Sequence, residues 1–138
     1  MNKNQSVKTP SAGLSVEKLR AQFKGHVIGP GDVGYDKART VFYGGIDKHP
    51  AVIIRVADPN DVANAISLAK TTGLALAVRS GGHSFAGYCV CDDGIVIDLC
   101  EMRKLDIESD KKTAWAQTGL TAIEATNAAD TQFGNWFW

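Results

Sequence analysis

The sequence predicts an α/β (α+β) fold built around a βαβ unit, because three consecutive patterns in the middle of the chain fit that arrangement. Residues 51–56 are a largely β-branched run, typical of a strand buried on both faces. Asp58 and Pro59 are a strong helix start, apolar residues follow at helical spacing, and Gly73 ends the pattern. Residues 74–78 then form a second apolar strand. Two strands joined by a helix in this way make a right-handed crossover.

The segment before this unit is predicted to contain only a short helix, turns and loops. Residues 1–11 are a polar tail, and Ser15 can cap a short helix that Gly25 ends. The Gly-Pro-Gly-Asp sequence at 29–32 indicates a turn, and residues 36–41 are expected to form one helical turn. We assign no chemistry to this part of the chain.

After the second strand, the chain is predicted to alternate between short strands, turns and one helix. The Asp-Asp-Gly sequence at 92–94 favours a hairpin-type turn. The other expected elements are an extended segment at 88–91, a buried strand at 95–99, a charged turn at 106–112, a strand at 113–118 and a helix at 120–133. The last five residues, 134–138, carry three aromatic side chains, and no later element is present to cover them.

The composition is that of one ordinary globular domain without net charge. The 138 residues include 15 basic and 15 acidic side chains, and 44% of them are hydrophobic. This balance gives no reason to expect a nucleic acid or an anionic membrane as partner. No apolar run approaches the roughly 20 residues that span a bilayer, and residues 1–13 lack the apolar core of a secretory signal. We therefore expect a cytoplasmic protein.

The three cysteines, Cys89, Cys91 and Cys100, are too few and too clustered for a disulfide framework. A metal site could combine Cys89 and Cys91 with His83, but Cys-x-Cys is not the usual spacing of zinc ligands. On an extended chain these two cysteines point to one face, which suits burial as small apolar side chains. The sequence therefore favours no metal site.

A glycine-rich segment follows the second strand of the unit and is the candidate functional site. Gly81 and Gly82 allow backbone conformations closed to other residues, so several N–H groups can converge on one point and bind a phosphate. The plain alternative is a tight turn between two strands. The polar residues crowded at this strand end favour binding, because open α/β sheets bind ligands there. The candidate binding residues are Arg79, Ser80, Gly81, Gly82, His83, Ser84 and Gly87.

Two ordered motifs resemble the N-terminal FAD-binding subdomain of FAD-linked oxidases. They are Ala77-Val-Arg-Ser-Gly-Gly-His-Ser-Phe-Ala-Gly87 and Cys91-Asp-Asp-Gly-Ile-Val-Ile-Asp-Leu99. The family in question is the berberine-bridge-enzyme-like branch of the vanillyl-alcohol-oxidase superfamily, whose flavin domain is called PCMH-type. Upstream, Tyr35-Asp-Lys-Ala-Arg39 and the helix start at 57–61 are similar to the same family in order and spacing. The resemblance covers roughly residues 19–133.

The resemblance implies an FAD site. In such a domain the loop matching residues 79–84 wraps the FAD pyrophosphate, and the histidine matching His83 is a candidate for a covalent bond to the 8α-methyl group of the flavin. The implied domains are an N-terminal tail with a short helix and loops at 1–46, and an incomplete PCMH-type FAD-binding domain at 47–138. The implied activity is hydride transfer from an alcohol, sugar or secondary-metabolite substrate to FAD, with reoxidation by oxygen.

The chain departs from the family pattern in two respects. Tyr43 stands where many relatives carry Asn, which affects a polar contact but not the loop. The second glycine-rich FAD segment, and the substrate domain with its catalytic base, have no counterpart before residue 138. We therefore assign no catalytic residue, and we expect the isolated chain to be inactive and to self-associate through uncovered apolar surface. Two alternatives remain: a non-catalytic nucleotide- or phosphate-binding module, and an inactive truncated fragment.

Overall fold

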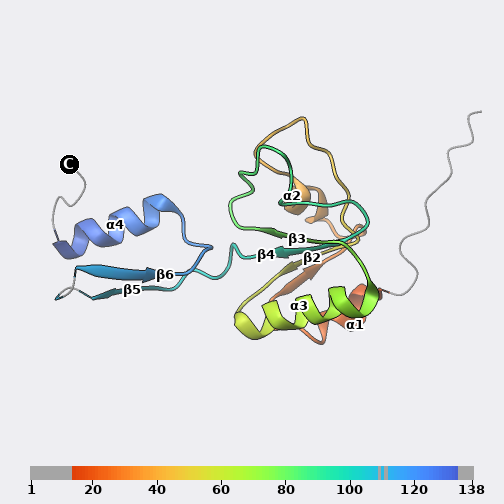
Figure 1. The fold of residues 1–138 in the computed structure, drawn as a ribbon, viewed down its shortest axis with the longest axis horizontal. Coiled ribbons are helices and arrows are strands. Elements are labelled where there is room, and N and C mark those ends of the chain that lie inside the picture. The colour runs from red at the N-terminus through yellow and green to blue at the C-terminus, as the bar shows by residue number, and fades with distance from the viewer. Residues whose placement is uncertain (1–13, 109, 111, 134–138) are drawn as a thin grey trace, which may run out of the picture.

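The computed structural model describes residues 14–108, 110 and 112–133. In this part of the chain, a four-stranded sheet has helices on both faces, and a two-stranded sheet with one helix over it lies to the side (Figure 1). The elements are α1 (Val16–Arg20), β1 (His26–Ile28), α2 (Tyr35–Arg39), β2 (Val52–Arg55), α3 (Pro59–Thr72), β3 (Leu76–Arg79), β4 (Ile95–Asp98), β5 (Leu105–Glu108), β6 (Thr113–Ala116) and α4 (Ala122–Phe133). The predicted α/β fold class is confirmed.

The helix boundaries follow the local signals in the sequence. Ser15 is the N-cap of α1, and its side chain accepts a hydrogen bond from the Lys18 amide. The Asp58 carboxylate caps α3 by accepting from the amides of Asn60, at 2.8 Å, and Asp61, at 3.1 Å. Gly73 closes α3 in the left-handed conformation, with φ of 68°, which a residue with a Cβ adopts only with strain. The predicted caps Ser15, Asp58 and Gly73 are therefore confirmed. The prediction that Gly25 ends the first helix is wrong, because α1 ends at Arg20 with Ala21 as its C-cap.

The large sheet has the strand order β1-β2-β4-β3, so β4 lies between the two strands of the crossover unit. It runs parallel to both neighbours, and all four of its residues are buried. The strand β1 pairs with β2 antiparallel and forms one edge. Because β3 and β4 are parallel, residues 80–94 must travel the length of the sheet between them. This long connection carries the glycine-rich segment.

Three further sequence predictions were wrong. Residues 26–28 were expected in a loop but form β1, because three residues reach strand geometry only through pairing with β2. Residues 106–108 were expected in a charged turn, yet they belong to β5, whose apolar and charged side chains alternate between its faces. Residues 88–91 were expected to be extended, but residues 88–89 lie in a turn and 90–91 belong to no strand, so the bend at 92–94 leads into β4 and joins no hairpin.

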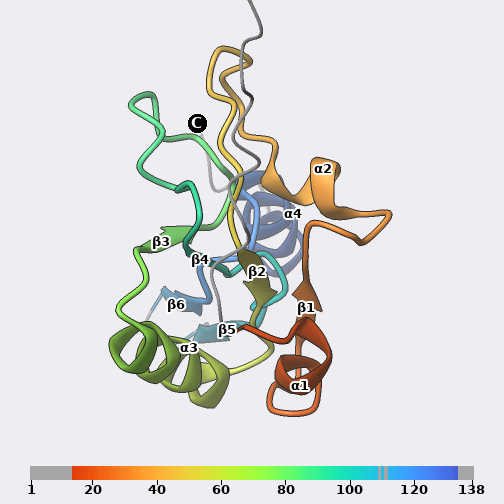
Figure 2. The same cartoon turned by 90° about the vertical axis from the view of Figure 1, so that its right-hand side faces the viewer.

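Apolar side chains fill both faces of the large sheet. On one face α1 and α3 cover a core that includes Ile54 and Ile97, and on the other α2 and the 80–94 connection cover one that includes Ile53 and Val96. Figure 2 shows α1 and α3 on one side of the strands and α2 on the other. These four side chains are at most 1% exposed. The burial of each one stabilises the folded state by about 1.5–3 kcal/mol.

Buried Asp61 joins α3 to the segment after α1. Its carboxylate accepts hydrogen bonds from the amides of Lys24 at 3.0 Å, Gly25 at 2.9 Å and Ala57 at 3.0 Å. Residues before 47 thus share the sheet and both cores with those that follow, and packing is continuous across the predicted boundary. The division at 46/47 stays a prediction about the family domain. Within the described part of the chain, no helix is long and apolar enough to cross a membrane.

Candidate functional site

The glycine loop, residues 79–87, leaves the carboxyl end of β3, the same sheet edge at which β2 and β4 end. Gly82 and Gly87 have positive φ angles of 72° and 69°, a conformation that strongly favours glycine. Space is also restricted, because a Cβ on Gly82 would lie 3.2 Å from Arg79 Nη2 and one on Gly87 would lie 3.0 Å from Ile46 Cδ1. The predicted placement of the glycine pair at a strand end, outside any helix, is confirmed.

Next to the loop, three charged side chains lie side by side at the carboxyl ends of the parallel strands β2, β4 and β3. Asp98 at the end of β4 lies in register with Arg55 on one side and Arg79 on the other. Its Oδ2 lies 3.4 Å from Arg55 Nε and 3.9 Å from Arg79 Nε, and its side chain is 3% exposed. The amide of Cys100 donates to its other oxygen at 3.1 Å. The buried carboxylate thus has a positive neighbour on each flanking strand.

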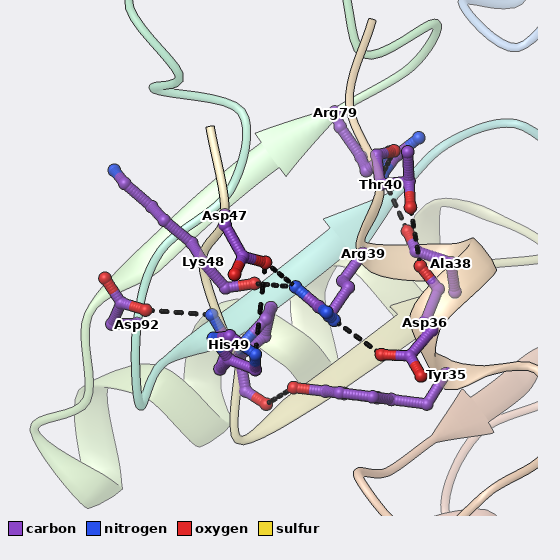
Figure 3. Close-up of polar contacts among 11 residues, drawn as sticks. Tyr35, Asp36, Ala38, Arg39, Thr40, Asp47, Lys48, His49, Arg79 and Asp92 are labelled. Carbon is purple, nitrogen blue, oxygen red and sulfur yellow. Dashed lines mark hydrogen bonds and ion pairs between the residues drawn. The ribbon is translucent and has the colours of Figure 1, made fainter. Parts of the chain in front are cut away.

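Arg79 extends from β3 toward the end of α2 (Figure 3). Its Nη1 donates to the carbonyl oxygens of Ala38 at 2.6 Å and Thr40 at 3.1 Å. A positive charge is favourable at such helix-terminal carbonyls. The guanidinium, predicted as a phosphate ligand, is therefore engaged with the fold through Nη1. Its contact with a phosphate stays a prediction.

A second arginine fixes the other end of the segment that follows α2. Arg39 donates to Asp36 at 2.8 Å, to the Lys48 carbonyl at 3.3 Å, and to Asp47 (Figure 3). The hydrogen bond from Arg39 lowers the pKa of Asp47 below its usual value. Tyr35 adds a hydrogen bond from its hydroxyl to the Pro50 carbonyl, at 2.7 Å. Residues 40–46 are thus held at both ends, by Arg79 and by Arg39.

This held segment and the glycine loop together form an aromatic cluster of Phe42, Tyr43, His83 and Phe85. The ring centroids of Phe42 and His83 are 5.2 Å apart, and those of Tyr43 and Phe85 are 4.7 Å apart. Phe42 and Tyr43 meet edge to face at 5.8 Å. The Phe42 amide also donates to the Gly82 carbonyl at 3.1 Å. The backbone therefore places these rings beside the glycine loop.

A pocket of about 390 Å³ lies between the glycine loop and the start of α4. Ser80, Gly81 and His83 line one side, and the other residues in its wall are Cys100, Arg103, Gly119, Leu120, Thr121 and Ala122. The Ser80 hydroxyl donates to the Thr118 carbonyl and so joins the two walls. Gly119 is required by close packing, since a Cβ there would lie 2.2 Å from the Leu99 carbonyl oxygen.

The α4 side of the pocket carries one cation and a helix start. Thr121 and Glu124 form a capping box, in which the Thr121 amide donates to Glu124 at 2.9 Å. The hydrogen bonds from Thr121 lower the pKa of Glu124. Arg103 Nη2 lies 2.9 Å from the same carboxylate and is half exposed. The first-turn amides of α4 and the Arg103 guanidinium are thus available to an anion in the pocket.

Residues 50–138 match the family model described as the FAD binding domain. The chain belongs to this family. FAD is accordingly its cofactor, and its fold is that of PCMH-type flavoenzymes, as the resemblance predicted.

Two curated relatives and one solved structure show how much of a flavoenzyme the chain covers. It is 38% identical to (R)-6-hydroxynicotine oxidase from Paenarthrobacter nicotinovorans over 86 residues. This aligned stretch covers 62% of this chain and 19% of that protein. It is 34% identical over 85 residues to berberine bridge enzyme-like 9 from Arabidopsis thaliana, 60% of this chain and 16% of that one. The crystal structure of 6-hydroxy-D-nicotine oxidase from Arthrobacter nicotinovorans matches with a TM-score of 0.75 at 34% identity, over 78% of this chain and 24% of that one. The chain thus spans about a fifth of these curated relatives.

The residues present fit the phosphate part of FAD. Two glycines with positive φ shape the loop backbone, and the pocket beside it has backbone donors and one arginine. The predicted residues divide by position: Ser80, Gly81 and His83 line the pocket, whereas Gly82 and Gly87 are buried and shape the loop. Ser84 belongs to the loop itself, because its hydroxyl accepts from the Tyr88 amide at 3.1 Å.

The sequence reasoning missed the α4 wall of the pocket. Gly119 and the Thr-x-x-Glu pattern from Thr121 to Glu124 were visible signals for a tight backbone approach followed by a helix start. Arg103 gave no signal, since its role depends on contacts between distant segments. As for metals, the described residues contain no cluster of three or more His, Cys, Asp or Glu side chains that could hold an ion. Of the two cysteines considered for zinc, Cys89 belongs to the 80–94 connection and is buried in the core that this connection shares with α2.

Proposed function

We propose that this chain forms the pyrophosphate-binding part of the FAD site in an FAD-linked oxidoreductase. The observation that carries the proposal is the pocket between the glycine loop and the start of α4. Its two walls come from the two parts of the fold, and both offer donors to an anion. A diphosphate carries two negative charges within a few ångströms, which matches convergent backbone N–H groups and a nearby guanidinium.

Each wall has a distinct role in this proposal. The N–H group of Gly81 binds a phosphate oxygen directly, because no side chain at this position blocks the approach. Gly82 is buried and acts indirectly, by holding the loop backbone in its positive-φ conformation. Arg103 supplies the compensating charge, and the first turn of α4 supplies further amides. Glu124 is not a barrier to an anion here, since its carboxylate already accepts from Thr121 and Arg103.

In the complete enzyme, bound FAD accepts a hydride from the substrate. We propose an alcohol, a sugar or a secondary metabolite as that substrate and oxygen as the final electron acceptor, in line with the resemblance of the chain to FAD-linked oxidases. No residue of this chain is given a catalytic role. The part played by the chain is to bind the cofactor and to hold it in one orientation.

His83 is the candidate covalent anchor for FAD. Its ring is exposed, lines the pocket and contacts Phe42. A neutral imidazole nitrogen has an electron pair that can form a bond to the 8α carbon. Overall, one C–H and one N–H bond are replaced by a C–N bond, and oxygen takes the two hydrogen atoms as hydrogen peroxide. His83 is placed for this bond because it lies where the pocket meets the aromatic cluster.

The pyrophosphate site can be tested on the 138-residue chain by thermal shift and calorimetry with FAD and ADP. Both ligands should raise the melting temperature. Gly82→Ala should weaken both by about 10- to 100-fold. The added Cβ is strained at the positive φ of this position and displaces the loop, at the cost of one charge-assisted hydrogen bond worth about 1.5–3 kcal/mol. Gly31→Ala is the matched control, since Gly31 has no atoms within 4 Å of an added Cβ and no positive φ.

The outcomes separate the proposal from its alternatives. Absence of a shift with either ligand would refute the site. Binding of ADP with no gain from the rest of FAD would favour a phosphate-binding module without flavin. For the anchor, the complete enzyme, with the chain extended past residue 138, is incubated with FAD in air and precipitated with acid. Flavin fluorescence should stay in the wild-type pellet and be lost from His83→Ala; a wild-type pellet without flavin would leave His83 only a non-covalent role.

A further inference from the structure

A largely apolar groove of about 380 Å³ lies between α4 and the small sheet of β5 and β6. Figure 1 shows α4 running along this sheet. Leu105 and Ile107 line the groove, yet they are only half-buried and belong to neither core of the large sheet. Apolar groups that lie together at a surface, rather than singly, commonly mark a docking site.

The groove is hollow because most of the side chains that face it are small. In the β5–β6 ladder, the large residues that line it pair with alanines, Leu105 with Ala116 and Ile107 with Ala114. From α4 come Ala125 and Ala129, which are four residues apart and therefore lie on one face of the helix. Protein interiors are closely packed, so an occupant of this groove must bring bulky apolar side chains.

The last five residues of the chain have the side chains that the groove lacks. Their sequence is Gly-Asn-Trp-Phe-Trp, and they lie outside the described residues. An aromatic side chain can bury about 150–250 Å², more than the alanines and threonines of the groove wall. The other terminal segment outside the described residues, 1–13, is polar and has no aromatic residue. Composition therefore selects residues 134–138 as the occupant.

The segment also begins within reach of the groove. α4 ends at Phe133, and Ala129 lies four residues earlier, or about 6 Å along the helix axis. Five extended residues span up to about 17 Å, and a glycine such as Gly134, directly after a helix, is the residue type that most often lets the chain reverse. So short a tether gives an effective concentration in the millimolar range, which favours this segment over a second copy of the chain in dilute solution.

We propose that residues 134–138 turn back at Gly134 and dock their aromatic side chains in the groove between α4 and the small sheet. The groove is thus a docking surface for a segment of the same chain. Contact with the apolar groove wall removes the rings from water and holds α4 against β5 and β6. This role goes beyond the proposed function and does not depend on FAD binding.

The test reads the fluorescence of Trp136 and Trp138 in the 138-residue chain with Trp115→Phe. This substitution removes the remaining tryptophan, which is 76% exposed and alternates with the alanines of β6 that line the groove. The two tryptophans should emit at shorter wavelength than in the urea-unfolded chain and should be protected from quenching by acrylamide. Ala129→Glu places a charge in the groove, so it should move the emission maximum to that of the unfolded chain and abolish the protection.

Asn127→Glu is the matched control, because it adds the same charge to α4 at an exposed position that does not line the groove. It should leave emission and quenching unchanged. If Ala129→Glu lowers the helical signal in circular dichroism, Ala129→Gln replaces it, since the larger polar side chain should displace the segment without burying a charge.

Three results would overturn the proposal. The first is emission and quenching equal to those of the unfolded chain before any groove substitution. The second is protected tryptophan that neither Ala129 variant exposes, which would place the segment elsewhere. The third is protection that appears only as the protein concentration rises, which would make a second copy the occupant. Protection that is independent of concentration, lost in the Ala129 variant and kept in Asn127→Glu, supports docking within one chain.

Discussion

Replacing Arg79 by Ala should destabilise the chain in the absence of any ligand. The Arg79 side chain is 12% exposed, lies 3.9 Å from the buried Asp98 carboxylate, and donates through Nη1 to Ala38 and Thr40. Removing one partner of a buried ion pair lowers the free energy of unfolding by about 3–5 kcal/mol. This figure includes the loss of the hydrogen bonds that the charged guanidinium donates. This loss is a large fraction of the free energy of unfolding of a typical domain, about 5–15 kcal/mol. It corresponds to a fall in melting temperature of about 10–20 °C.

The assays are thermal and urea unfolding of the 138-residue chain, both followed by circular dichroism. Arg79→Lys keeps the charge but not the planar fork, so it should recover only part of the loss. Arg20→Ala is a control, because its bonds to Asp32 lie at the surface and should contribute little. A melting temperature within 2 °C of wild type for Arg79→Ala would refute the reasoning, and a selective loss of ADP affinity would return Arg79 to the phosphate role.

Two further predictions concern stability. Asp61→Ala should lower the free energy of unfolding, measured in urea, by about 3–5 kcal/mol. The reason is that three backbone amides, including that of Gly25, donate to the buried carboxylate and would lose their acceptor. An unchanged urea midpoint would contradict this. Burial, and then the hydrogen bond to Asp98, raise the pKa of the Cys100 thiol from 9.0 to about 11. Between these values the unfolded chain releases a proton that the folded chain keeps, so the contribution of Cys100 is complete below pH 9 and is lost as the pH rises to 11. Alkylation of Cys100, followed by mass spectrometry, should be slow at pH 8 and should accelerate toward pH 11, and fast labelling at pH 8 in the folded state would argue against it.

Features set by local chemistry could be predicted from the sequence. The start and end of α3 follow from Asp58, Pro59 and Gly73, whose preferences act within a single turn. β2 and β4 follow from short β-branched runs that leave no polar face, so both sides had to be buried. The glycine loop could be placed at a strand end because the strand before it was clear. All these signals lie within a few residues of the feature that they specify.

Features set by contacts between distant segments could not be predicted. The place of β4 between β2 and β3 depends on the whole sheet, and β1 exists only by pairing with β2. Asp61 lies in the first turn of α3, yet its carboxylate accepts from the amides of Lys24 and Gly25, some 36 residues earlier. The direction of the Arg79 side chain likewise depends on where α2 ends. A single sequence carries no record of these pairings.

The position of the pocket makes ligand binding and folding of the two parts interdependent. The large sheet contributes the glycine loop, and the segment before α4 contributes Gly119 and Thr121, with the Ser80 hydroxyl bonded across to Thr118. A ligand held by both walls binds only when the two walls are in contact. At a concentration of 100 times its Kd, the ligand stabilises this folded arrangement by about 2.7 kcal/mol. A substitution that displaces the phosphate-binding loop, such as Gly82→Ala, should therefore reduce the shift that the ligand produces. Loss of Arg79 should instead lower stability equally with and without the ligand, because its contacts lie within the large sheet and α2. The two classes of variant can thus be told apart by comparing melting curves with and without ADP.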